Sequence, residues 1–111
     1  MNSINRKLIG DCLKELSDRG LQERVWMSSG PPEVSSFTEA VEQLFTDSGL
    51  EDALHSGKTG FGREAELVLL ELEKQLGNVN TRLGAALIIS DPAMRRVREL
   101  ASSALGLIQK S

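Results

Sequence analysis

The chain has 111 residues, of which 40% are apolar and 26% charged, with one cysteine and a net charge of −3. This balance predicts one soluble globular domain over residues 1–111, and a single cysteine excludes an intramolecular disulfide or a cysteine-based zinc site. The N-terminus lacks the apolar run of a signal peptide, and no stretch is long enough to span a bilayer. We therefore expect a cytoplasmic protein that has no membrane partner.

Negative charge is concentrated in the middle of the chain. Residues 31–76 hold ten acidic and three basic side chains, a net charge of −7, whereas residues 1–30 sum to +1 and residues 77–111 to +3. Such a segment would repel nucleic-acid phosphates and attract a basic protein. The pattern predicts a protein partner and no nucleic acid.

The first expected element is a helix from about Ile4 to Arg19. Apolar residues recur at helical spacing, Asn2 or Ser3 can cap the start, and Gly20 lies just past the expected end. Cys12 falls on the apolar face, where we expect a small buried hydrophobe.

The next stretch, Leu21–Ser29, is either a short helix or extended over Val25–Ser28. Trp26, the only tryptophan, either packs in the core or anchors an interface. A break is expected at Gly30-Pro31-Pro32, because proline removes a backbone donor and restricts the residue before it.

A second helix is predicted to begin at Ser36 and to end at Gly49. Ser36 and Glu39 have the spacing of a capping box, in which each satisfies a backbone amide of the first turn. The expected buried face consists of Phe37, Ala40, Val41, Leu44 and Phe45. The outer face carries acidic residues, namely Glu39, Glu42 and Asp47.

A short helical turn over Leu50–His55 and a glycine-rich loop precede the helix that we expect to be central. The loop contains Gly57, Gly60 and Gly62, and we expect it to be the most flexible stretch and a functional loop. The central helix, Glu64–Leu76, has an apolar stripe wide enough to predict neighbours on several sides. Its apolar residues are Ala65, Leu67, Val68, Leu69, Leu70, Leu72 and Leu76.

The C-terminal part predicts a long last helix over Pro92–Lys110, with Asp91 as its N-cap. Before it, a short helix over Thr81–Ile88 is favoured, although Ala85–Ile89 could form a strand. Three arginines near the start of the last helix are solvated, pair with the acidic middle or contact a partner; they are Arg95, Arg96 and Arg98.

No catalytic, cofactor or metal motif is complete. Gly57-Lys58-Thr59 resembles the end of a phosphate-binding loop, but Asp52 stands where the pattern needs an earlier glycine. Asp47, Glu51 and His55 could line one face of a helix, but Gly49 interrupts it and no second histidine completes a transition-metal site. We expect no enzyme, no cofactor and no metal.

The runs SSFTEAVEQLFTDSGLEDAL and ISDPAMRRVRELASSAL belong to a small acidic chain that resembles, in kind, the immunity proteins of bacterial polymorphic toxin and contact-dependent growth inhibition systems. The resemblance implies a helical cytoplasmic protein that binds and neutralises a basic, nuclease-type toxin domain. It also implies that an acidic surface covers the active site of the toxin.

The sequence as a whole predicts an all-α bundle, orthogonal or irregular, of four to six helices around residues 64–76 and 92–110. Its expected function is to bind a cognate protein as a monomer or weak homodimer. The expected contact residues are Trp26, Glu39, Glu42, Asp47, Glu51 and Asp52. The alternatives are a homodimerising regulatory or scaffold module and an enzyme that uses the glycine loop.

Overall fold

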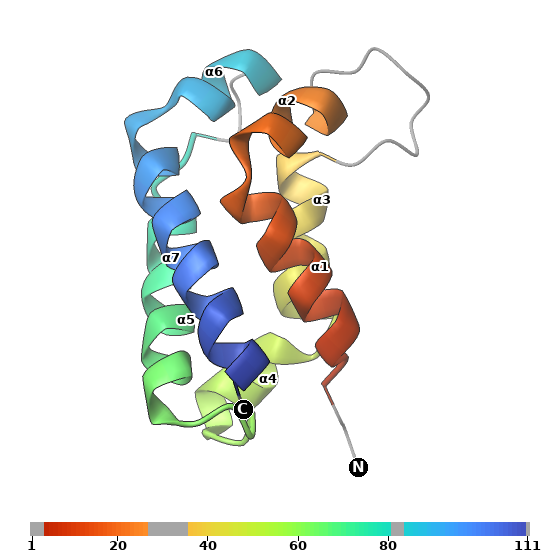
Figure 1. Ribbon diagram of the computed structural model, residues 1–111, viewed down its shortest axis with the longest axis vertical. Helices are drawn as coiled ribbons and strands as arrows, with labels where there is room; N and C mark the ends of the chain where they lie inside the picture. Colours follow the sequence, from red (N-terminus) through yellow and green to blue (C-terminus); the bar gives the residue numbers. More distant parts are fainter. Residues whose placement is uncertain (1–3, 27–35, 81–83, 111) are drawn as a thin grey trace.

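The computed structural model describes residues 4–26, 36–80 and 84–110, and all regular structure in these ranges is helical (Figure 1). The all-α prediction is confirmed, although these ranges hold seven α-helices where four to six helices were expected. The elements are α1 (Arg6–Ser17), α2 (Arg19–Trp26), α3 (Phe37–Glu42), the π-helical turn η1 (Gln43–Asp47), α4 (Leu50–Ser56), α5 (Arg63–Leu76), α6 (Ala85–Ser90) and α7 (Pro92–Lys110).

Four helical segments run along the long axis of the molecule in alternating directions: α1, α3 with η1, α5, and α7 (Figure 1). Short helices turn the chain between them. α2 and α6 contact each other at one end, and α4 lies at the other end. The bundle is irregular because these three short helices lie across its ends.

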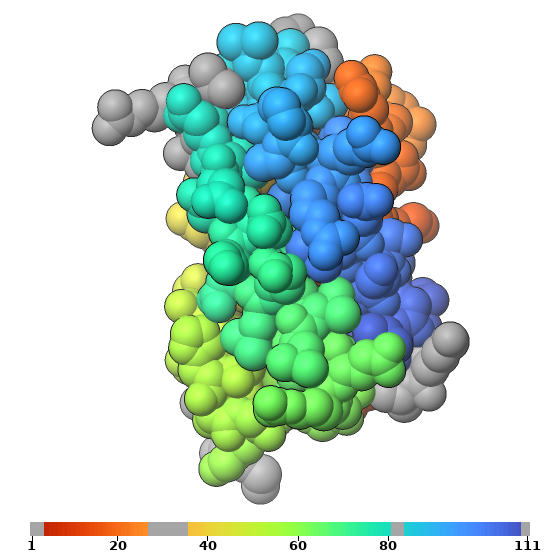
Figure 2. Space-filling model, turned by 90° about the vertical axis from the view of Figure 1, so that its left-hand side faces the viewer, coloured from red at the N-terminus to blue at the C-terminus, as the bar shows by residue number. Residues whose placement is uncertain are grey.

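The last helix, α7, organises the core. It packs extensively against both α5 and α1, and α1 packs in turn against α3 and η1. Figure 2 shows the side of the molecule on which α5 and α7 lie next to each other. Among the described helices, α3 with η1 and α5 have no comparable contact. One side of the four-segment bundle is therefore less closely packed than the other three.

The predicted apolar stripe of α5 is wider than the face that the helix buries. Ala65, Leu69, Leu72 and Leu76 are buried, as expected. However, Leu67 is 51% exposed and Leu70 is 38% exposed. The expectation that α5 is covered on several sides is wrong for these two residues, because its main neighbour is α7 alone.

The first helix ends at Ser17, two residues before its predicted end, and Asp18 follows it. This residue has an extended conformation, and its carboxylate Oδ1 accepts a hydrogen bond of 3.1 Å from the amide of Leu21, as an N-cap does. A new helix, α2, therefore begins at Arg19 and contains Gly20, which we had expected to follow the helix end. Asn5 caps α1 by accepting a hydrogen bond from the amide of Leu8, and the expected caps, Asn2 and Ser3, lie outside the described ranges. Over residues 21–26 the ambiguous stretch is helical; residues 27–29 lie outside the described ranges.

The second predicted helix begins as expected, with the hydroxyl of Ser36 accepting a hydrogen bond from the amide of Glu39. It does not remain α-helical, because the amide of Ser48 bonds to the carbonyl of Gln43, five residues earlier. The hydroxyl of Ser48 donates to the carbonyl of Leu44, which competes with the regular helical pattern. The result is the π-helical turn η1, a local widening that is often found at functional sites.

The remaining segments of the described ranges for which short elements were predicted are helical. α4 matches the expected short turn, and Ala85–Ser90 forms α6 rather than a strand. Residues 81–83, the first part of the favoured helix, lie outside the described ranges. α7 has the predicted bounds, and Asp91 accepts a hydrogen bond of 2.9 Å from the amide of Ala93. None of the helices in the described ranges has the length and apolar character needed to cross a membrane.

The glycine-rich loop is anchored to the fold. The Thr59 hydroxyl donates to Oε2 of Glu66 over 2.6 Å and accepts from the amide of Phe61. Thr59 and Phe61 are buried, and the Arg6 guanidinium lies 5.0 Å from the centre of the Phe61 ring. This loop, expected to be flexible and functional, therefore connects α4 to α5 through buried contacts.

Candidate functional site

A groove of about 340 Å³ occupies the less closely packed side of the bundle, where α3 with η1 faces α5. Its volume is at the small end of the range for ligand pockets, roughly 300–1,000 Å³. α3 and η1 form one wall, α4 contributes Glu51, and the end of α5 forms the other wall. The lining residues are Phe37, Thr38, Val41, Glu42, Phe45, Thr46, Glu51, Glu73, Leu76 and Gly77.

The floor of the groove is apolar, because the residues of α3 that turn inward come from its predicted apolar face. Phe37 and Phe45 are buried, and Val41 is half-buried between them in sequence. Leu76 closes the floor from α5. An apolar surface of this kind favours contact with apolar side chains of a ligand.

The rim of the groove is acidic. Glu42 and Glu51 are exposed, and Glu73 is half-buried. The span from Phe37 to Ser56 contains five carboxylates and no lysine or arginine. No ion pair with a lysine or arginine of the described ranges is made by these five carboxylates or by Glu73. The uncompensated charge makes this edge attractive to a cationic partner.

The predicted contact residues are only partly brought together. Glu42 and Glu51 line the groove, whereas Asp47 and Asp52 are exposed but are not part of its lining. Glu39 is half-buried and accepts a hydrogen bond of 3.5 Å from the side chain of Gln43.

Trp26 belongs to the core and is only 7% exposed. Its indole Nε1 donates to Oε2 of Glu15 over 2.6 Å, which satisfies its polar atom. Its ring meets Phe37 in an edge-to-face arrangement, with centroids 5.7 Å apart. The packing interpretation of Trp26 fits this arrangement, so we leave it out of the proposed contact surface.

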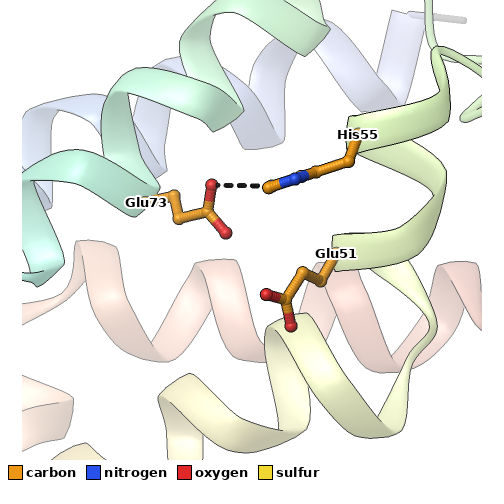
Figure 3. A group of neighbouring side chains, drawn as sticks. All are labelled: Glu51, His55 and Glu73. Atoms are coloured by element: carbon orange, nitrogen blue, oxygen red, sulfur yellow. Dashed lines mark hydrogen bonds and ion pairs between the residues drawn. The ribbon is translucent and has the colours of Figure 1, made fainter.

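Glu73 is a residue of the site that was not among the predicted contact residues. This residue belongs to α5, yet it lies beside the acidic residues of α4, and the Nε2 atom of His55 is 3.2 Å from its Oε1 atom (Figure 3). Glu51 lies one turn before His55 on α4, so Glu51, His55 and Glu73 form one cluster of side chains. No local signal in the sequence could have linked Glu73 to α4, because their proximity depends on how α5 folds back.

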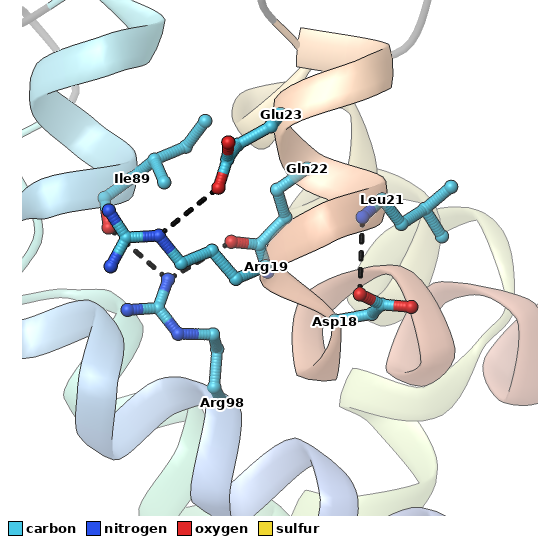
Figure 4. Close-up of polar contacts among 7 residues, drawn as sticks. All are labelled: Asp18, Arg19, Leu21, Gln22, Glu23, Ile89 and Arg98. Atoms are coloured by element: carbon cyan, nitrogen blue, oxygen red, sulfur yellow. Dashed lines mark hydrogen bonds and ion pairs between the residues drawn. The ribbon is translucent and has the colours of Figure 1, made fainter.

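The three arginines of α7 have different environments. Arg95 and Arg96 are exposed, and Arg96 pairs with Glu99 at 3.9 Å. Arg98 is half-buried, and its Nη1 donates to Oε1 of Gln22 and to the carbonyl of Ile89 (Figure 4). Burial, and to a lesser extent the nearby Arg19, lower the pKa of Arg98. Arg98 therefore has a structural role within the chain. From the sequence, it could equally have been solvated, have paired with the acidic segment or have contacted a partner.

Comparison with known proteins adds no relative: no protein-family model, no curated protein and no solved structure matches this chain. The groove and its acidic rim are therefore the basis for a functional assignment.

Proposed function

We propose that this chain is a protein-binding module whose groove receives a basic segment of another protein, and that it acts as an immunity protein. In this role it binds a cognate toxin domain, best matched by a nuclease-type domain whose active site is basic. The proposal assigns the chain itself no catalytic step and no nucleic-acid ligand.

The observation that carries the proposal is the coincidence of the open side of the bundle with its uncompensated negative charge. Three carboxylates from three segments, Glu42, Glu51 and Glu73, stand around an apolar floor. Asp47 and Asp52 extend the negative surface beyond the groove. A segment that carries both apolar and basic side chains satisfies both parts of this site.

The two parts of the groove have different physical roles. Burial of apolar side chains on the floor contributes affinity that depends little on salt, at about 25 cal/mol per Å² removed from water. The rim accelerates encounter with a basic partner and selects against acidic ones, and its effect weakens as salt screens the charges. A basic nuclease site must attract phosphates, and the same field draws it to this rim.

The test is affinity capture from the native bacterium with this protein as bait, at low and high salt. A variant with Glu42→Lys, Asp47→Lys, Glu51→Lys and Asp52→Lys, all exposed residues of the acidic surface, is compared with wild type. The matched control reverses four acidic residues on other surfaces, Asp11, Glu23, Glu64 and Glu99, which are all exposed. Both variants change the net charge by the same amount. A difference in binding between them therefore comes from where the reversed charges lie and not from the total charge.

We expect the wild type and the control to retain one basic partner that the groove variant loses. Co-expression of that partner with wild type should protect cells from its toxicity, whereas the groove variant should not protect them. Equal retention by the groove variant and the wild type would show that this surface is not the binding site. A partner that is not toxic would refute the immunity role while leaving the binding role intact.

The alternative, a homodimerising module, is favoured by one observation. Leu67 and Leu70 are three residues apart on the outer face of α5, and both are exposed. If this face joins two copies, the sedimentation coefficient of the purified protein should rise with concentration. The double substitution Leu67→Glu and Leu70→Glu should then abolish that rise. A constant, monomeric value for wild type would exclude this alternative.

A further inference from the structure

Glu51, His55 and Glu73 form a compact group of potential metal ligands at the edge of the groove. One donor atom of each residue lies within 4.8 Å of those of the other two. Figure 3 shows the His55 ring directed toward Glu73, with the Glu51 carboxylate on the same side of α4. Because Glu51 and His55 are one helical turn apart, they project from the same face of α4.

The separation between the His55 and Glu73 donor atoms suits a tetrahedral metal site. Ligand bonds of about 2.0–2.2 Å to Zn²⁺ place neighbouring donor atoms of a tetrahedral site roughly 3.3–3.6 Å apart. His55 Nε2 and Glu73 Oε1 are already 3.2 Å apart. Glu51 is exposed, so its side chain can rotate to shorten the remaining separation without disturbing the core.

The backbone that carries these ligands is well supported. α4 begins after Gly49 and packs against α5 and η1. The loop between α4 and α5 is held by the hydrogen bond from Thr59 to Glu66. Two helices joined in this way hold the backbone of the ligands in place before a metal arrives, which reduces the cost of binding.

We propose that Glu51, His55 and Glu73 bind one divalent transition-metal ion of the Zn²⁺ type. This replaces the sequence-based expectation of no metal, because Glu73 of α5 supplies a third ligand that the pattern along α4 lacked. One imidazole nitrogen and two carboxylate oxygens form a donor set that favours such an ion over Mg²⁺, which prefers oxygen ligands alone. Three protein ligands leave a further coordination position for water. Glu51 and Glu73 also line the groove, so the ion lies at its rim. The proposal concerns the chain alone and is independent of the proposed partner.

The test is a calorimetric titration of tag-free, chelator-treated protein with ZnCl₂, together with NMR of the histidine ring. His55 is the only histidine, so its ring resonances report on this site alone. We expect one ion per chain and a shift of these resonances that saturates at that ratio. Zinc at about 100 times its dissociation constant should raise the melting temperature by roughly 10 °C.

Glu73→Gln, Glu51→Gln and His55→Asn should each weaken zinc binding by about tenfold or more, since loss of even an outer-shell partner costs roughly 10–100-fold. The matched control is Asp52→Asn, which removes the same charge beside Glu51 but no ligand. It should change the affinity by less than about twofold, as expected for a screened surface charge.

Several results would overturn the proposal. These are unmoved His55 resonances, unchanged affinity in Glu73→Gln, an equal loss in Asp52→Asn, and stronger binding of Mg²⁺ than of Zn²⁺. Circular dichroism of each variant separates loss of a ligand from loss of the fold. Since no partner is present, failure here leaves the proposed function untouched, and failure of partner capture leaves the zinc titration untouched.

Discussion

Arg98 on α7 donates a hydrogen bond of 3.1 Å to Oε1 of Gln22 on α2, which is 76 positions away in the chain. The same guanidinium nitrogen donates to the carbonyl of Ile89 at 3.2 Å. Gln22 is fully buried, and its amide nitrogen donates to the carbonyls of Glu15 and Leu16. This one amide therefore links α1, α2 and α7.

Substitution of Arg98 should destabilise the protein. Arg98→Ala leaves the buried Gln22 oxygen without its donor, and a buried unsatisfied acceptor costs about 1–3 kcal/mol. We expect the free energy of unfolding in urea to fall by roughly 2–3 kcal/mol. Arg96→Ala is the control, and it should change this free energy by less than about 0.5 kcal/mol because its ion pair is exposed. Similar losses in both variants would contradict a specific role for Arg98.

Substitution of two glycines by alanine should change the free energy of unfolding in opposite directions. Gly10 lies inside α1, and a Cβ there would meet nothing within 4 Å, so Gly10→Ala should stabilise the protein by about 0.5–1 kcal/mol. Gly49 has φ of 81° before α4, and alanine there should destabilise it by about 1–2 kcal/mol. Urea unfolding of both variants measures these changes. A stabilising Gly49→Ala would be inconsistent with the left-handed conformation.

Cys12 should react slowly in the folded protein. Burial raises the pKa of its thiol from 9.0 to about 11, and the carboxylates of Glu15 and Asp11 add to the rise. At pH 8 the reactive thiolate is therefore scarce. We expect slow modification by a thiol-specific disulfide reagent, with fast modification once urea unfolds the chain. Fast modification without urea would mean that Cys12 is accessible.

The same pKa shift predicts a loss of stability at high pH. The folded state holds the thiol proton more tightly than the unfolded state, so this contribution is fully present below pH 9. It is lost as the pH rises from 9 to about 11, by roughly 2–3 kcal/mol in total. Cys12→Ala should remove this part of the pH dependence, as measured by urea unfolding at pH 8 and pH 10.5. An unchanged pH dependence in Cys12→Ala would show that the Cys12 thiol does not cause the loss of stability at high pH.

The bond between Thr59 and Glu66 should hold the glycine loop in place. Thr59→Val keeps the shape of the side chain but removes the donor to Glu66 and the acceptor for the amide of Phe61. We expect a loss of about 1–3 kcal/mol in the free energy of unfolding and faster amide hydrogen exchange at residue 61. Exchange that stays as slow as in wild type would show that packing of Phe61 alone fixes the loop.

Much of the fold could be predicted because the helices carry clear apolar periodicity. α7 is the best case, since Asp91 and Pro92 mark its start and its inward residues recur regularly. The end of the first helix was predicted to within two residues, but the start of α2 at Arg19 was missed, because it depends on a single side-chain cap, Asp18, and α2 includes the glycine expected to end the first helix. The π-helical turn was missed because it depends on Ser48, whose hydroxyl bonds within the helix.

The site was less predictable than the fold. The acidic residues of α3 and α4 could be identified because they are neighbours in sequence. The groove exists because α5 does not pack closely against the segment formed by α3 and η1. No local sequence pattern predicts which pairs of helices pack loosely. Glu73 joins the site only through that tertiary arrangement, and burial of Trp26 likewise depends on its contact with Phe37.

The edge-to-face contact between Trp26 and Phe37 allows the intrinsic tryptophan fluorescence of the protein to report on the groove. The chain has one tryptophan and no tyrosine, so fluorescence excited in the near ultraviolet comes from a single indole. Phe37 touches that indole on one side and lines the groove on the other. A segment that enters the groove and moves the Phe37 ring changes the surroundings of the emitting group. Occupancy can then be followed in solution without any attached dye.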